Sequence, residues 1–129
     1  MHGLHLITEL HGCGCAAALL CDAGALRELC QHEIRAAGLT IVGELFHAFA
    51  PARAGEPAGV TGVVLLAESH LALHTWPELG VVTLDIYVCN RRHDAGPAAR
   101  QVLAALQRAF DPARSDSREL TRSAVQSCA

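Results

Sequence analysis

Apolar and polar residues alternate along several stretches of the chain in the way that is typical of β-strands. The stretch from Val81 to Asn90 is the clearest, because every second residue from Val82 to Val88 is a branched aliphatic residue. The intervening positions carry Thr83, Asp85, Tyr87 and Cys89, so this strand has one apolar and one more polar face. The same reasoning predicts further strands at 3–10, 40–49, 60–67 and 70–76.

Two other stretches show helical spacing instead. The first runs over 23–37, with Asp22 as its N-cap and Gly38 at its end. The second runs over 97–110, and we also expect a short edge strand near 118–121. Because strands outnumber helices and the helices separate groups of strands, we expect an α+β fold. This fold is a two-layer α/β sandwich, a mostly antiparallel sheet with two helices on one face.

Composition narrows the classes of function. The 129 residues predict a single domain spanning 1–129, 51% of it apolar and with only three Phe. The net charge of −3 argues against a nucleic-acid partner, and no apolar run reaches the roughly 18 residues of a membrane span. The beginning of the chain does not resemble a secretory signal, so we expect a cytoplasmic protein.

Every basic side chain other than histidine is arginine, since the chain contains no lysine. A lysine-bound pyridoxal cofactor and a lysine Schiff base are therefore excluded. Chemistry on an amine through an imine would need a carbonyl group from another source.

The six cysteines are irregularly spaced, and we expect them to be reduced. His11, Cys13 and Cys15 surround a glycine-rich turn, but no second pair of ligands completes a zinc pattern. We therefore expect no metal. The histidines at positions 5, 11, 47 and 70 are expected to be structural.

The segment from Ala67 to Glu78, AESHLALHTWPE, resembles the self-cleavage segment of the small prokaryotic S-adenosylmethionine decarboxylases. These enzymes are made as proenzymes that cut their own backbone before a serine and convert that serine into a pyruvoyl group. Further blocks resemble the family in order and spacing, namely GLHL at 3–6, TIVG and FHAF at 40–43 and 46–49, GVTGVV at 59–64 and LDIYVC at 84–89.

The resemblance implies that cleavage falls between Glu68 and Ser69, giving fragments 1–68 and 69–129. It implies that Ser69 is the pyruvoyl precursor, whose ketone forms a Schiff base with the substrate amine, and that Cys89 donates a proton to the substrate carbon. His74 and the hydroxyl of Thr61 would assist the self-cleavage.

By the same resemblance, Glu78 would bind the ribose hydroxyls of S-adenosylmethionine. Phe49 would stack on adenine, with Phe46 or His74 on the other side of the ring. The enzyme would be a homodimer of processed protomers with shared active sites, and its product would supply aminopropyl groups for spermidine synthesis.

Some features leave other functions open. Thr61 stands where the family commonly has serine, Leu79 where an aromatic residue is frequent, and Asn90 where glycine is usual. A changed pocket would suit a pyruvoyl-dependent arginine or ornithine decarboxylase, and loss of cleavage would suit a regulatory or metal-binding module. Ser69 and His74 are five residues apart, so a shared role also requires a turn or bulge between about Glu68 and Leu71.

Overall fold

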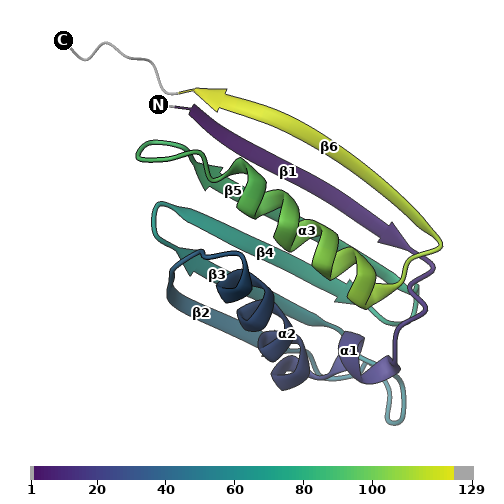
Figure 1. The fold of residues 1–129 in the computed structure, drawn as a ribbon. Coiled ribbons are helices and arrows are strands. Elements are labelled where there is room, and N and C mark those ends of the chain that lie inside the picture. Colours follow the sequence, from purple (N-terminus) through teal and green to yellow (C-terminus); the bar gives the residue numbers. More distant parts are fainter. Residues whose placement is uncertain (1, 124–129) are drawn as a thin grey trace.

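The described part of the chain forms one six-stranded antiparallel sheet (Figure 1). The structure is a computed structural model and describes residues 2–123. The order of the strands across the sheet is β2-β3-β4-β5-β1-β6, so the first strand of the chain lies between the last two. The strands are β1 (His2–His11), β2 (Ile41–Ala48), β3 (Val60–Leu66), β4 (Ser69–Trp76), β5 (Val81–Cys89) and β6 (Arg114–Ser123).

Within residues 2–123, three helices cover one face of this sheet, which confirms the expected two-layer α+β sandwich. They are α1 (Ala17–Cys21), α2 (Ala23–Ala36) and α3 (Gly96–Phe110). The Asp22 side chain caps α2 by accepting hydrogen bonds from the backbone N–H groups of Gly24 and Ala25, as predicted. Helix α3 is followed by Asp111 as its C-cap, whose left-handed backbone turns the chain toward β6.

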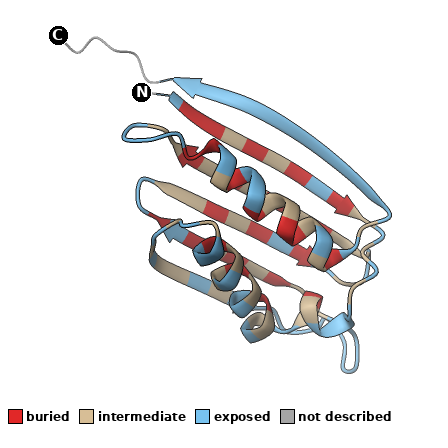
Figure 2. Ribbon diagram, in the orientation of Figure 1, coloured by how far each residue is buried: buried red, intermediate tan, exposed pale blue. Residues whose placement is uncertain are grey.

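The core lies between the helices and the sheet, and it is built by strand alternation. Leu71 and Leu73 of β4 are buried under the helices, as are Leu84 and Ile86 of β5. Figure 2 shows buried and more exposed residues alternating along the central strands, whereas β6 is exposed along its whole length. The opposite face of the sheet, here called the open face, has no covering layer among the described residues.

Two features differ from the sequence expectations. Helix α1 was not predicted, because a five-residue helix is too short to show periodicity. Strand β6 extends over ten residues rather than the four expected near 118–121, and all ten residues pair with β1. Within residues 2–123, none of the helices has the length and apolar character needed to cross a membrane.

Candidate active site

The proposed cleavage position lies in a tight turn between β3 and β4. Leu66 and Ser69 are paired across the two strands, so Ala67 and Glu68 alone make the connection. Glu68 has a positive φ of 61°, a conformation that residues with a side chain rarely adopt. The turn ends at Glu68, directly before Ser69, and the strand pairs regularly from Ser69 onward. The turn or bulge expected between about Glu68 and Leu71 to bring Ser69 and His74 together is therefore not present.

Ser69 is linked to β5 through its side chain. Its Oγ accepts a hydrogen bond of 3.1 Å from the backbone N–H of Cys89. The pairing of β4 with β5 ends at His70 and Tyr87, and the Ser69 hydroxyl accepts from the N–H two residues farther along β5. The hydroxyl is therefore directed along the sheet toward β5, close to Cys89.

A hollow of about 330 Å³ adjoins this turn. Glu68 and Cys89 line it together with Arg92 and His93, which follow β5. Neither residue was assigned a functional role from the sequence, since Arg92 was expected to be a solvated strand end, and exposed polar residues after a strand carry no specific signal.

The second group of predicted residues lies farther along the same strand. Thr61 of β3 and His74 of β4 are directly opposite each other, and a hydrogen bond of 2.9 Å joins Thr61 Oγ1 to His74 Nδ1. The His74 ring is exposed on the open face, with its centroid 5.9 Å from that of Trp76. The two residues expected to assist self-cleavage are thus hydrogen-bonded to each other.

A groove of about 520 Å³ lies at the same end of β4, where Thr75 and Trp76 line it. Phe49 and Glu78 both line it, and Trp76 forms part of its wall. Phe49 is 53% exposed and meets the His47 ring edge-on, with 4.7 Å between centroids. An exposed aromatic face beside a carboxylate can hold a planar heterocycle and its hydroxyl-bearing sugar.

Phe46 does not reach this groove. It packs partly buried against the core, and its ring lies against Gly62 on the helix-covered side of the sheet. Strand alternation explains the difference, because Leu45 and His47 are the residues of β2 that face outward there. Of the two phenylalanines named from the sequence, the structure brings only Phe49 to the groove.

The two groups of residues are well separated within one chain. Ser69 and His74 lie at the two ends of β4, and five residues of strand span about 16 Å. The strand is regularly paired from His70 to Trp76, so the turn at Glu68 does not bring the two side chains together. One protomer therefore holds Ser69 and Cys89 at one end of the sheet and Thr61, His74 and the groove at the other.

The cysteines of the described residues are free thiols at positions 13, 15, 21, 30 and 89, while Cys128 lies outside that range. Burial is the main cause that raises the pKa of Cys13, and the neighbouring Cys15 adds to it. The Cys30 thiol lies deep in the core, where burial raises its pKa to about 12. The thiols of Cys13, Cys15 and Cys30 therefore do not resemble an activated thiolate.

The fold and the site together define a small α/β sandwich that carries a strained turn before a serine and a separate Thr-His pair. The sequence model of the family described as S-adenosylmethionine decarboxylase matches residues 4–123. The chain therefore belongs to the S-adenosylmethionine decarboxylase family.

Individual relatives agree with this assignment. The chain is 36% identical to an S-adenosylmethionine decarboxylase proenzyme of Picrophilus torridus, over 93% of this chain and 83% of the relative. It is 32% identical to a proenzyme of the same name from Methanococcus maripaludis, over 96% of this chain and 92% of that one. The crystal structure of the adenosylmethionine decarboxylase from Aquifex aeolicus superimposes with a TM-score of 0.81 at 31% identity, covering 96% of this chain and 92% of that one.

Proposed function

We infer that this protein is an S-adenosylmethionine decarboxylase, made as a proenzyme that cleaves itself, and we propose that Ser69 is the residue converted into its pyruvoyl group. The observation that carries the proposal is the left-handed turn at Glu68 directly before a serine whose hydroxyl is held beside Cys89. The family assignment favours S-adenosylmethionine over the arginine or ornithine considered from the sequence. The product is decarboxylated S-adenosylmethionine, an aminopropyl donor for spermidine synthesis.

Self-cleavage begins when Ser69 Oγ attacks the carbonyl carbon of Glu68, so that the peptide bond becomes an ester. Removal of the Ser69 Cα proton then expels the Glu68 carboxylate, which ends the first fragment. The dehydroalanine left at position 69 takes up water and releases ammonia, which leaves a pyruvoyl group. The whole sequence consumes one water and produces one ammonia. The strained turn at Glu68 supports the first step, because ester formation relieves a conformation that the peptide holds at a cost.

The pyruvoyl group, once present, supplies an electron sink when carbon dioxide leaves the substrate. The residues around position 69 suit this group, because the adjoining hollow is lined by Cys89 and by the new end at Glu68. The Cys89 thiol is only partly buried and would hold the proton that the substrate carbon receives. Phe49 would position the adenine ring, and Glu78 would accept hydrogen bonds from the ribose hydroxyls. Phe46 has no part in this arrangement.

The proposal includes a homodimer in which each active site draws residues from both copies. Thr61 and His74 lie about 16 Å along the strand from Ser69, too far to assist its cleavage within one chain. The open face also exposes Leu45 at 68% and Leu65 at 49%, apolar side chains that a second copy would cover. A two-fold axis through this face would place Ser69 and Cys89 of one protomer opposite Thr61 and His74 of the other. The free thiols support a cytoplasmic location.

Intact mass spectrometry of the purified protein tests the proposal, with a Ser69→Ala variant beside it. We expect two fragments, 1–68 and 69–129, whose masses sum to that of the chain plus water minus ammonia, while Ser69→Ala stays whole. A Ser115→Ala variant, which changes an exposed serine of β6, should be cleaved normally. An uncut wild-type chain after long incubation would refute the proposal.

The substrate is tested on the cleaved protein by release of labelled carbon dioxide. S-adenosylmethionine labelled in its carboxyl group should release it, while arginine and ornithine should not. Release from arginine or ornithine alone would keep the pyruvoyl chemistry and reject the proposed substrate.

A further inference from the structure

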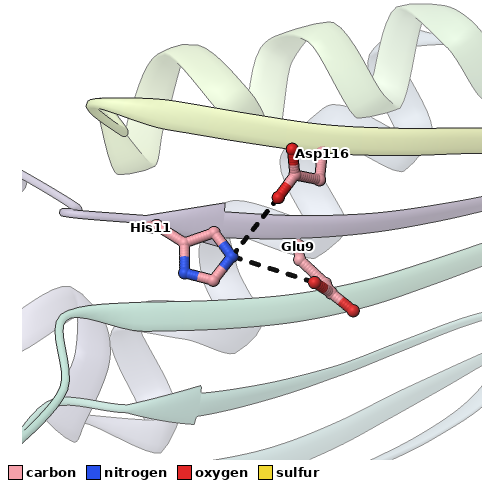
Figure 3. A group of neighbouring side chains, drawn as sticks. All are labelled: Glu9, His11 and Asp116. Carbon is pink, nitrogen blue, oxygen red and sulfur yellow. Dashed lines mark ion pairs between the residues drawn. The ribbon is translucent and has the colours of Figure 1, made fainter.

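Three side chains capable of binding a metal ion meet on the open face where β1 lies beside β6 (Figure 3). Glu9 and His11 are two residues apart on β1 and so share one face, and Asp116 of β6 is paired directly with Glu9. One ligand atom from each of the three lies within 4.8 Å of the others. His11 Nε2 is 3.8 Å from a Glu9 carboxylate oxygen and 3.7 Å from an Asp116 carboxylate oxygen.

These contacts leave the imidazole unsatisfied. His11 Nε2 is fully buried and has no hydrogen-bond partner, because both carboxylate oxygens are too far away for a hydrogen bond. A buried polar nitrogen without a partner is costly, and such groups in native proteins call for a specific explanation. The nitrogen lies between two negatively charged oxygens, which is where a cation would satisfy it.

The direct pairing of the Glu9 and Asp116 carboxylates also favours a bound cation. Like charges directly opposite each other on neighbouring strands destabilise a sheet. The Arg114 guanidinium approaches Asp116 to 3.5 Å, but no cationic side chain forms an ion pair with Glu9 apart from His11 among the described residues. A divalent ion among the three side chains would offset both negative charges at once.

We propose that Glu9, His11 and Asp116 form a binding site for one divalent transition-metal ion of the zinc type. Bonds of about 2.0–2.2 Å from one ion to two ligand atoms allow those atoms to lie up to about 4.2 Å apart. Both distances from His11 Nε2 fit this limit as they stand. Rotation of the exposed Glu9 and Asp116 side chains can bring their oxygens to the same ion.

The mixture of ligands selects the type of metal. An imidazole nitrogen with two carboxylates suits zinc, cobalt or manganese, whereas magnesium and calcium prefer oxygen ligands alone. Three protein ligands leave at least one position for water or for another molecule. The histidine expected from the sequence to be structural thus becomes a metal ligand, and the expectation of no metal is revised by this proposal.

The site is separate from the candidate active site but lies in line with it. The strand register runs from Asp116 through Glu9 and Thr83 to His74, so two strand spacings, about 10 Å, separate Glu9 from His74. An ion held by Glu9 and His11 of β1 and Asp116 of β6 would join the edge strand to the rest of the sheet. Its expected effect is therefore on the attachment of β6, and not on the reacting atoms.

Cobalt titration of protein previously treated with a chelator tests the site, because the visible spectrum of Co²⁺ distinguishes its ligands. We expect one Co²⁺ per protomer, no thiolate-to-metal charge-transfer band, and a higher melting temperature in the presence of the ion. Loss of even an outer-shell partner lowers metal affinity about 10- to 100-fold, so His11→Ala and Asp116→Asn should weaken binding at least as much. Glu9→Gln, a conservative change of an exposed side chain, repeats the test with little risk to folding.

Two controls keep the result specific. Asp85→Asn removes a carboxylate from the same face of the sheet and should leave Co²⁺ affinity unchanged. A Cys13→Ser/Cys15→Ser double variant should also bind normally. Binding that survives in all three ligand variants, binding that disappears with the two cysteines, or no binding to the wild type would each overturn the proposal. The titration is repeated on uncleaved Ser69→Ala protein, where the same result is expected, so a failure of self-cleavage cannot be mistaken for a failure of the metal site.

Discussion

The Ser69 hydroxyl accepts its hydrogen bond from the backbone N–H of Cys89, and not from the Cys89 thiol. The main chain of β5 therefore holds the proposed cofactor precursor, while the thiol of the same residue remains available to a substrate. Under the proposed mechanism, Cys89 would have two separable roles, a backbone role before cleavage and a side-chain role after it. Changing the side chain should affect only the second role.

Cys89→Ala should accordingly be cleaved as readily as the wild type but decarboxylate poorly. The backbone N–H remains in place, so Ser69 keeps its hydrogen bond. Loss of a positioned proton donor is expected to lower the decarboxylation rate on the order of 100- to 10,000-fold. Mass spectrometry follows cleavage, and release of carbon dioxide follows turnover. Cys21→Ala, at a half-buried thiol of α1, is the matched control and should change neither quantity. A cleaved Cys89→Ala protein with full activity would contradict the role of the thiol.

The hydrogen bond between Thr61 and His74 gives a second prediction. Thr61→Val keeps the shape of the side chain and removes its hydroxyl, so cleavage should slow on the order of 100-fold. Thr61→Ser keeps the hydroxyl and should be cleaved at close to the wild-type rate. Because the pair is exposed, both variants should keep their stability within about 0.5 kcal/mol. Time courses of cleavage and urea unfolding of the Ser69→Ala background measure the two effects separately. Equal cleavage rates for valine and serine would show that the hydroxyl has no part in processing.

Complementation between inactive chains tests whether the active site is shared. A Ser69→Ala chain lacks the cleavage serine, and a His74→Ala chain lacks the assisting histidine, so neither alone should be processed. In a mixed dimer, the intact His74 of the first chain would lie opposite Ser69 of the second. Co-expression should therefore cleave the His74→Ala chain and leave the Ser69→Ala chain whole. If both chains stay uncut together while the wild type is cleaved, the residues act within one protomer or the proposed pairing of faces is wrong.

The sequence predicted the elements with strong periodicity and missed what depends on pairing. Helices α2 and α3 and the five apolar strands follow from their spacing and their caps. Strand β6 has no buried residue, so its length is determined by its hydrogen bonds with β1 and not by any pattern of its own. The position of β1 between β5 and β6 likewise has no local signal.

The candidate active site could likewise be predicted only where it does not depend on strand pairing. The motif from Ala67 to Glu78 identified Ser69, His74 and Glu78 together, but it could not show that the strand separates them. Phe46 faces the helices and Phe49, directly after β2, lines the groove, and this difference depends on the register of β2 against β3. Glu9 and Asp116 are paired although more than a hundred positions separate them in the chain, so sequence spacing could not reveal that they are neighbours.

The buried thiol of Cys30 gives a prediction about stability at alkaline pH. Cys30 is fully buried in α2, and burial, with a smaller contribution from Glu44, raises its pKa from 9.0 to about 12. Because the folded pKa exceeds the unfolded one, the unfolded chain loses this proton first as the pH rises. The stability that Cys30 contributes is therefore complete below about pH 9 and declines between about pH 9 and pH 12. At pH 10, one pH unit above the unfolded pKa, the loss should be about 1.4 kcal/mol. Urea unfolding of uncleaved Ser69→Ala protein from pH 7 to 10 measures this decline, and adding Cys30→Ala should make it shallower by that amount.

Adding Cys21→Ala instead serves as the control for removal of a thiol outside the core. Parallel pH curves with and without Cys30 would show that its thiol ionises in the folded protein as easily as in the unfolded chain.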